Sequence, residues 1–177
     1  MSNTQTLAST TDTISRRYEI ATDGACRGNP GPGAWGAILF SKEGQTLIGS
    51  PRELFGLKRE TTNNEMELTA AIKALTWLNA HNRPEHRSAP VTLFTDSEYL
   101  TKGMTEWVPR WNSNGWRSSE GKPVKNRELW EALIGAASER HITWTWVRGH
   151  AGHPENEQAN ALAQATLDRA LQLKRVA

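Results

Sequence analysis

Two acidic residues stand where predicted β-strands end, and residues of this type in this position can do chemistry. The run 18–23 alternates with the period of a strand, ends at Asp23 and precedes a Gly- and Pro-rich turn at 28–33. The β-forming run 91–95 ends at Asp96. Carboxylates at strand ends are accessible to a cation and rigid enough to hold it. Because open α/β sheets bind ligands at the carboxyl ends of their strands, we expect the two acids to be neighbours.

A third acid, Glu67, lies near the start of a predicted helix. Apolar residues recur with helical spacing from Leu68 to Leu78, and Asn63 and Asn64 occupy the positions expected for an N-cap.

Each of the three acids also has a purely structural interpretation. Asp23 suits a turn, and Glu67 has the spacing of a capping box that begins at Asn64. Thr95 and Glu98 have the same spacing around Asp96, which would then serve a helix dipole. The residues alone leave these alternatives open.

Residues 106–127 combine tryptophans with basic side chains. The segment has five basic residues against Glu106 and Glu120, an excess of +3. Such a surface can follow a phosphate backbone and stack against sugars. Alternatively, the rings form a small satellite core under a long loop. The residues concerned are Trp107, Trp111, Trp116, Arg110, Arg117, Lys122, Lys125 and Arg127.

The composition bounds the class of protein. A chain of 177 residues suits one domain, and a net charge of +2 decides little about partners. A single cysteine, Cys26, excludes an internal disulfide and a Cys-rich zinc site. No apolar run approaches the roughly 20 residues of a membrane span, so we expect a soluble, cytoplasmic protein with no membrane partner.

The predicted organisation is one domain at 18–170 between a disordered tail at 1–17 and a C-terminal tail at 171–177. The first tail is rich in Ser and Thr, and a transit peptide is the less favoured alternative. Further predicted elements are a third strand at 45–52, a helix at 127–140 with Leu129, Ala132, Leu133 and Ala136 on its buried face, a strand at 142–147 and a helix from Pro154. His150 lies in the loop 148–153, where an exposed histidine without a functional role is common.

Six motifs, in order, closely resemble those of bacterial type 1 ribonuclease H. They cover roughly residues 18 to 170 and are Thr22-Asp-Gly24, Gly28-Asn-Pro-Gly-Pro-Gly33, Thr61-Thr-Asn-Asn-Glu-Met-Glu-Leu68, Thr95-Asp-Ser97, Lys122-Pro-Val-Lys-Asn126 and Gly149-His-Ala-Gly-His-Pro-Glu-Asn-Glu157.

The resemblance implies an α/β fold: a five-stranded mixed sheet, three antiparallel strands and then two parallel ones, with helices on both faces. It also implies an endonuclease that cleaves the RNA strand of RNA–DNA hybrids with two Mg²⁺ ions, Mn²⁺ being an alternative. Asp23, Glu67 and Asp96 match three of the family's four metal-binding acids, and His150 matches its loop histidine. Hard carboxylate oxygens suit Mg²⁺.

The resemblance also implies a substrate surface. Cys26, Asn29, Asn63 and Asn64 match positions along the minor groove of the hybrid, where 2′-hydroxyls distinguish RNA from DNA. Of the remaining matches, Thr62 and Asn126 correspond to a DNA-phosphate pocket, Trp107 and Trp111 to a channel for the DNA strand, and Arg148 to a residue that steers phosphates.

The sequence departs from the family pattern at the fourth acid, where Asn160 stands in place of Asp. An amide oxygen can ligate a metal but brings no charge, so weaker metal binding or slower turnover is expected. Glu157, one helical turn away, is a candidate substitute. Glu98 stands where many relatives carry Gln, and the basic segment is thinner than in relatives, which predicts weaker hybrid affinity.

Two other functions compete with the hydrolase. One is a hybrid-binding protein whose active site has decayed through Asn160. The other is a different nuclease or transposase on the same fold. We expect a monomer in each case.

Overall fold

In the computed structural model, which describes residues 16–149 and 152–176, the strands form one six-stranded mixed sheet. The long strands β1 (Arg16–Cys26) and β2 (Gly31–Glu43) form an antiparallel pair, and β4 (Arg52–Thr61) extends it along β2. On the other side of β1, β5 (Val91–Thr95) and β6 (Ile142–Trp146) add in parallel. The two-residue β3 (Thr46–Leu47) pairs with the end of β2. The expected mixed α/β sheet is thereby confirmed, with β3 as an addition.

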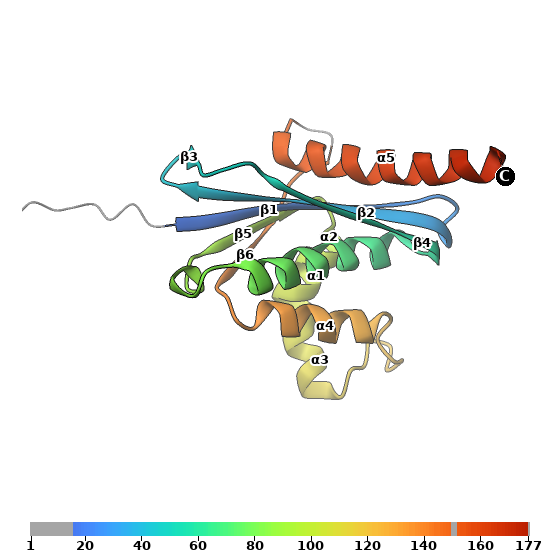
Figure 1. Cartoon of the computed structure of the whole chain (residues 1–177). Helices are drawn as coiled ribbons and strands as arrows, with labels where there is room; N and C mark the ends of the chain where they lie inside the picture. Colours follow the sequence, from blue (N-terminus) through green and yellow to red (C-terminus); the bar gives the residue numbers. More distant parts are fainter. Residues whose placement is uncertain (1–15, 150–151, 177) are drawn as a thin grey trace, which may run out of the picture.

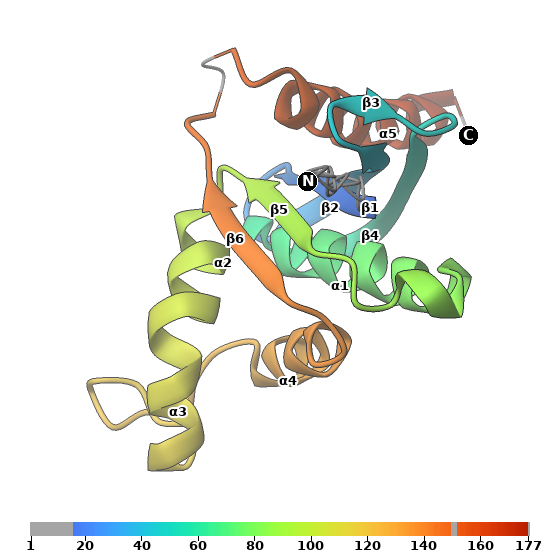
Figure 2. The ribbon, with the colours of Figure 1, turned by 90° about the vertical axis from the view of Figure 1, so that its left-hand side faces the viewer.

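Helices cover both faces of this sheet (Figure 1). One face carries α5 (Pro154–Val176), and the other carries α1 (Asn63–His81) and α4 (Arg127–Ala137). A helical column leads away from the sheet in Figure 2 and consists of α2 (Glu98–Lys102), the π-helical η2 (Gly103–Trp107) and α3 (Val108–Asn114). A short 3₁₀ turn, η1 (Pro84–His86), links α1 to β5. No helix in the described ranges is long and apolar enough to cross a membrane.

The main core lies between the sheet and α1, and it continues without a break to α4 and the tryptophans. Trp130 and Leu133 of α4 are fully buried, and Trp116 is 9% exposed in the same cluster. Trp111, Trp116 and Trp130 therefore belong to the main core, so the alternative of a separate satellite core under the loop is wrong. A smaller cluster of Ala25, Ala34, Ala163 and Leu167 packs α5 on the opposite face.

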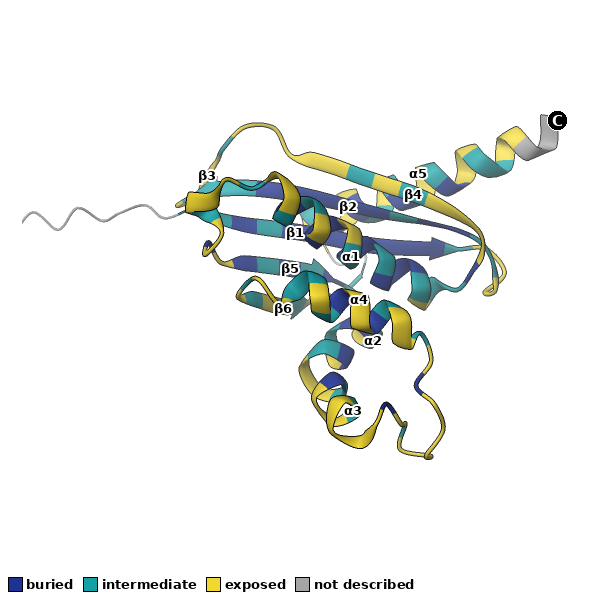
Figure 3. Ribbon diagram, turned by 60° about the horizontal axis from the view of Figure 1, so that its bottom comes forward, coloured by how far each residue is buried: buried dark blue, intermediate teal, exposed yellow. Residues whose placement is uncertain are grey.

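The third strand differs from its prediction. Instead of residues 45–52, the long partner of β2 is β4, at 52–61, which begins after Pro51. Figure 3 shows β4 largely exposed, and its burial pattern has few inward positions. An edge strand with both faces partly solvated shows little apolar alternation, and this hid it in the sequence.

The buried face of α4 also differs from the prediction. Leu129, Leu133 and Ala136 belong to the core as predicted, but Ala132 is exposed. Trp130 and Ile134 complete the buried stripe, and the helix ends at Ala137 rather than at 140. The indole of Trp130 fixes this rotation because its Nε1 donates to the Tyr99 hydroxyl at 3.2 Å.

The tails are partly structured. Arg16 and Arg17, expected in the N-terminal tail, belong to β1, and Arg16 pairs with Glu43. Residues 1–15 lie outside the described ranges, as does 177. Residues 171–176, expected as a C-terminal tail, continue the helix α5.

We predict that Gly103→Ala destabilises the protein by about 1–3 kcal/mol, because overpacking forces neighbours out of place. A Cβ at Gly103 would lie 2.0 Å from Cη2 of the buried Trp130. Urea unfolding measures the loss.

The matched control is Gly135→Ala, since nothing lies within 4 Å of a Cβ at this position inside α4. It should be neutral or stabilise by about 0.5–1 kcal/mol, the helix preference of Ala over Gly. Equal stability of the two variants would contradict tight packing at Gly103.

Candidate active site

Three acids from three separate elements converge at one end of the sheet. Asp23 comes from β1, Glu67 from the first turns of α1, and Asp96 from the junction of β5 and α2. One oxygen of each lies within 4.8 Å of the others. Asp23 and Glu67 are buried, at 5% and 3% exposure, and Asp96 is half-buried. The convergence expected of these residues is therefore present.

A close approach of β1 to α1 brings Asp23 and Glu67 together. A Cβ at Gly24 would lie 2.7 Å from the backbone nitrogen of Glu67 and 2.9 Å from Met66. Only glycine permits this contact. The Gly24 N–H also donates to Asp23 Oδ1 at 2.7 Å, which fixes the carboxylate on the strand.

Asp96 is held from the side of β6. The Trp146 indole donates to the Asp96 carbonyl at 3.0 Å. The chain after β6 passes so close that a Cβ at Gly149 would lie 2.5 Å from Asp96 Oδ2. No local pattern in the sequence predicts these two neighbours of Asp96, because both contacts join segments about fifty residues apart.

The capping interpretations of these acids are wrong. The N-cap of α1 is Thr62, one residue before the predicted asparagines, and its hydroxyl accepts from the Glu65 N–H. The acidic position of the capping box, three residues after Thr62, is therefore Glu65. Glu67 takes no part in the cap and belongs to the acidic cluster. At α2 the cap is Ser97, whose Oγ accepts from Leu100 N–H at 3.2 Å, so Thr95 does not begin the helix.

Burial dominates the electrostatics of the cluster. It raises the pKa of Glu67 well above the ordinary value, and the charges of Asp23 and Asp96 raise this pKa further. Glu67 Oε1 accepts from Asn63 Nδ2 at 3.4 Å, whereas Oε2 is buried without a hydrogen-bond partner in the described part of the chain. A buried carboxylate oxygen with no donor is destabilising unless a cation or a proton satisfies it.

The cluster fits a divalent metal ion. An octahedral Mg²⁺ with ligands at about 2.0–2.1 Å holds its oxygens roughly 3–4 Å apart, close to the spacing of these side chains. The donor atoms are all hard oxygens. A cation would also neutralise Glu67 Oε2, which is buried without a hydrogen-bond partner among the described residues.

Asn160 of α5 lines the same hollow, about 370 Å³ in volume, as the three acids. Its place follows from a close contact of α5 with β2, since a Cβ at Gly36 would lie 2.6 Å from the Ala159 carbonyl oxygen. The buried Asn156, which donates from Nδ2 to the Thr22 carbonyl at 3.4 Å, ties the same helix to β1. The amide thus comes from the face of the sheet opposite α1.

Further residues line this hollow. Glu98 and Ser97 begin α2, and Gln164 follows Asn160 by one turn of α5. Gln164 is not predicted from the sequence, although its i, i+4 spacing from Asn160 puts both residues on one face of the helix. Glu157 is exposed and accepts from the Gly152 N–H at 3.0 Å. It is not among the lining residues of the acidic hollow, and it therefore does not replace the acid that Asn160 lacks.

Most of the predicted substrate residues gather in a neighbouring hollow of about 590 Å³. It is lined by Asn29, Thr62, Asn64, Trp111 and Asn126, among others. Asn126 has φ +58°, and its Nδ2 donates to the Tyr99 hydroxyl at 3.3 Å.

The other predicted substrate residues lie around these hollows. Asn63 lines the acidic hollow, and its N–H donates to Asn29 Oδ1 at 3.0 Å. Cys26 Sγ contacts the Thr61 carbonyl oxygen at 3.3 Å. Trp107 stacks at an angle on Trp111, with ring centroids 5.8 Å apart. Both rings are half-buried, and Trp111 packs against the main core.

Two predicted site residues, Arg148 and His150, belong to the loop after β6. Arg148 lies exposed after β6 and is not among the lining residues of the acidic hollow. His150 lies outside the described residues, so its role stays a prediction.

Comparison with known proteins decides the family. The family model described as RNase H matches residues 15–168. The chain belongs to the ribonuclease H family. It is 53% identical over 150 residues to the ribonuclease H of Chelativorans sp. (strain BNC1), with 85% of each chain covered. It is also 48% identical over 156 residues to that of Dechloromonas aromatica (strain RCB), covering 88% of this chain and 97% of the relative.

A solved structure agrees with this membership. LC9-RNase H1, described as a type 1 RNase H with the type 2 active-site motif, is 31% identical with a TM-score of 0.75. The match covers 89% of this chain and 74% of that one. As a ribonuclease H, the protein is an enzyme, an endonuclease that hydrolyses phosphodiester bonds. The family depends on metal ions, in keeping with the acidic cluster.

We predict that the metal-free protein loses stability as the pH rises above about 4.5, the ordinary pKa of a Glu carboxyl. The unfolded chain releases the Glu67 proton there, whereas the folded protein retains it to higher pH. The folded state then binds more protons, and its stability falls with rising pH. Urea unfolding between pH 4.5 and 8 should show a fall that Glu67→Gln reduces.

The matched control is Glu60→Gln, which changes an exposed carboxyl on β4 and should leave the slope unchanged. A divalent cation at 100 times its Kd should restore about 2.7 kcal/mol to the unsubstituted protein at neutral pH. A slope that Glu67→Gln leaves intact would assign the pH dependence to other groups.

Proposed function

We propose that this protein cleaves the RNA strand of RNA–DNA hybrids with two divalent metal ions, Mg²⁺ in the first place. Asp23, Glu67 and Asp96 are the proposed ligands, with the amide of Asn160 as the fourth corner. One observation carries the proposal: oxygens of the three acids lie within 4.8 Å of one another, and one oxygen of Glu67 is buried without a hydrogen bond among the described residues. Both cofactor and substrate accord with membership of the family.

The bound ions supply activation of the attacking water and stabilisation of charge on the leaving oxygen. The chain supplies the geometry. Gly24 N–H donates to Asp23 Oδ1 and Asn63 Nδ2 donates to Glu67 Oε1, and these contacts hold both carboxylates at the wall of the hollow. Prepositioned ligands reduce the reorganisation that must precede an in-line displacement.

The proposed ligand set carries three negative charges. With an amide at Asn160, the fourth corner can coordinate or orient water but cannot neutralise cationic charge. We infer that the enzyme binds its metal more weakly than a homologue with four acids and needs more free Mg²⁺ for the same rate.

Discrimination of the hybrid is assigned to polar side chains beside the cluster. Asn63 lines the acidic hollow, and Asn64 lines both hollows, so both amides lie beside the proposed metal ligands. Amides can donate to and accept from a 2′-hydroxyl, the group that distinguishes RNA from DNA. Thr62 and Asn126, which line the second hollow, suit a phosphate of the DNA strand.

We predict that Asp23→Asn lowers cleavage of a labelled RNA–DNA hybrid at least about 100-fold, because a metal ligand contributes several kcal/mol to the transition state. The control is Asp168→Asn, the same chemical change at a half-exposed residue that pairs with Arg27 on the surface. It should cleave like the unsubstituted protein. Denaturing gels identify the strand that is cut.

The outcome also separates the competing functions. Cutting confined to the RNA strand supports the hybrid nuclease. Cutting of duplex DNA at a similar rate would favour another nuclease on this fold. Hybrid binding with no Mg²⁺-dependent cutting would favour the decayed, binding-only protein, for which Asn160 is the motivating feature.

We predict that Asn160→Asp lowers the Mg²⁺ concentration at half-maximal cleavage by on the order of tenfold, because the charge of the ligand set sets cation affinity. Rates across a Mg²⁺ titration measure it. Gln164→Glu, one turn further along α5 in the same hollow, is the matched control for added charge alone. Superimposable titrations for Asn160→Asp and the unsubstituted protein would remove this position from the metal site.

A further inference from the structure

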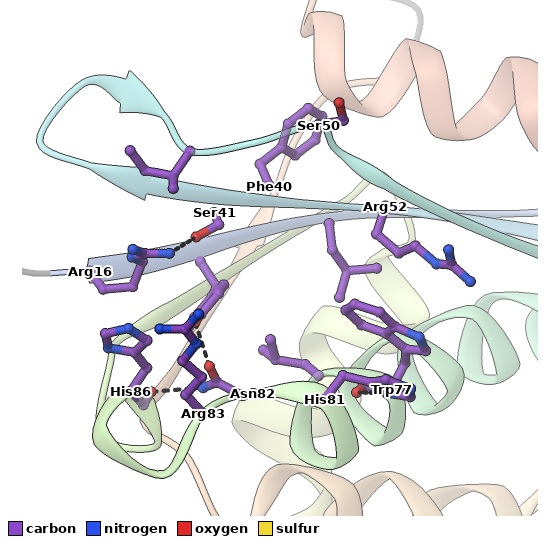
Figure 4. A pocket seen from close by; sticks show the side chains of 14 residues that line it. Arg16, Phe40, Ser41, Ser50, Arg52, Trp77, His81, Asn82, Arg83 and His86 are labelled. Atoms are coloured by element: carbon purple, nitrogen blue, oxygen red, sulfur yellow. Dashed lines mark hydrogen bonds between the residues drawn. The ribbon is translucent and has the colours of Figure 1, made fainter.

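A cationic pocket lies at the end of the molecule away from the acids. Figure 4 shows it between the start of β1, the edge of β2 and the end of α1. Its volume is about 360 Å³, and no described Asp or Glu is among its lining residues. The cationic or titratable side chains that line it are Arg16, Tyr18, Arg52, Arg83, His81 and His86.

This pocket is separate from the acidic cluster. Glu67 and His81 both lie on α1, fourteen positions apart, which corresponds to roughly 21 Å at about 1.5 Å per residue. The two hollows therefore sit near opposite ends of one helix and carry opposite charge. A ligand of the cationic pocket would leave the cleavage site free.

Two of the three arginines keep donors for a ligand. Arg16 is committed, because its Nε and Nη2 donate to Glu43 Oε1 at 3.0 and 2.6 Å and its Nη1 donates to Ser41 at 2.9 Å. Arg52 forms no ion pair within the described ranges. Arg83 only approaches Glu85, at 3.9 Å and with both side chains well exposed, and such a pair contributes little.

The wall that carries Arg52 is preorganised. The Trp77 ring stacks on His81 at 4.5 Å, and the Arg52 guanidinium lies 5.4 Å from the ring centroid. Stacking of this kind fixes a guanidinium plane while leaving its edge N–H groups free. Figure 4 shows the stack on one side and Arg83 on the other.

The floor of the pocket is apolar except for the hydroxyl of Tyr18. Leu39 and Leu78 are buried beneath the rim, and the Tyr18 hydroxyl donates to Asn82 Oδ1 at 2.5 Å. Burial raises the pKa of Tyr18 despite the nearby Arg16 and Arg140, so the hydroxyl stays neutral and does not cancel the arginine charge. The pocket thus combines an apolar floor with a positive rim.

We propose that this pocket binds a phosphate-bearing ligand of mononucleotide size, with Arg52 and Arg83 as its anion-binding groups. Guanidinium forks match phosphate oxygens, and the volume falls in the roughly 300–1,000 Å³ range of small-molecule sites. A concave pocket favours a terminal phosphomonoester, which carries about −1.5 to −2 charges, over the single charge of an internal phosphodiester. The source is a free nucleotide or the phosphorylated end of a nucleic-acid strand.

The test uses the full chain in metal-free buffer, with adenosine monophosphate, adenosine and inorganic phosphate as probes. Calorimetry measures affinity, and amide NMR signals of Ser41, Ser50 and Asn82 report on the pocket. We expect the monophosphate to shift these signals and adenosine not to do so. The double variant Arg52→Gln, Arg83→Gln should weaken binding about tenfold, whereas Arg59→Gln, an exposed arginine of the same strand β4, should not.

A second arm identifies the source. Short single-stranded DNA with a 5′-phosphate is compared with the same strand ending in a 5′-hydroxyl. Tighter binding of the phosphorylated strand than of the mononucleotide assigns the pocket to strand ends, and equal binding assigns it to free nucleotides. Shifts confined to the acidic or Asn126 hollows, affinity unchanged in the double variant, or adenosine binding as well as its monophosphate would overturn the proposal.

Discussion

Mutual repulsion among three carboxylates is the constraint on which the candidate site depends. Oxygens of Asp23, Glu67 and Asp96 are held within 4.8 Å of one another, partly out of water, where like charges raise the pKa of Glu67. The fold opposes this repulsion with backbone contacts that cannot relax, above all the approach of Gly24 to the first turn of α1. A cation held by the three acids would relieve this repulsion, so the proposed metal affinity would depend on the rigidity of these contacts.

The two layers of helices contribute unequally to this arrangement. The layer with α1 and α4 contains the large core, including the fully buried Trp130, and it fixes Glu67 firmly. The opposite layer is α5 alone, which packs through small residues such as Ala159 and Ala163 against Gly36. Close backbone packing of this kind sets position well but buries little apolar area. The amide corner of the site therefore rests on the weaker layer.

The sequence predicted the parts of the structure that local patterns encode. The strand that ends before Asp96, the helix that begins at Asn63 and the mixed sheet follow from periodicity and motifs, and the structure agrees with them. The strand end predicted at Asp23 is wrong, because β1 continues three residues further, to Cys26. The edge strand β4 was misplaced because solvent on both faces weakens alternation. The role of Trp130, the approach of Gly149 to Asp96 and the cap at Thr62 depend on contacts between distant segments or on a one-residue shift, which no local pattern specifies.

The seating of α5 has a consequence for how the enzyme would fail under stress. Asn160, the proposed fourth ligand, comes from a helix that packs alone on its face of the sheet and continues to Val176 (Figure 1). Detachment of this helix would cost less free energy than opening of the main core. Warming would then remove the neutral ligand first and leave the three carboxylates in place. Activity would then be lost at temperatures at which spectroscopy still reports a folded protein.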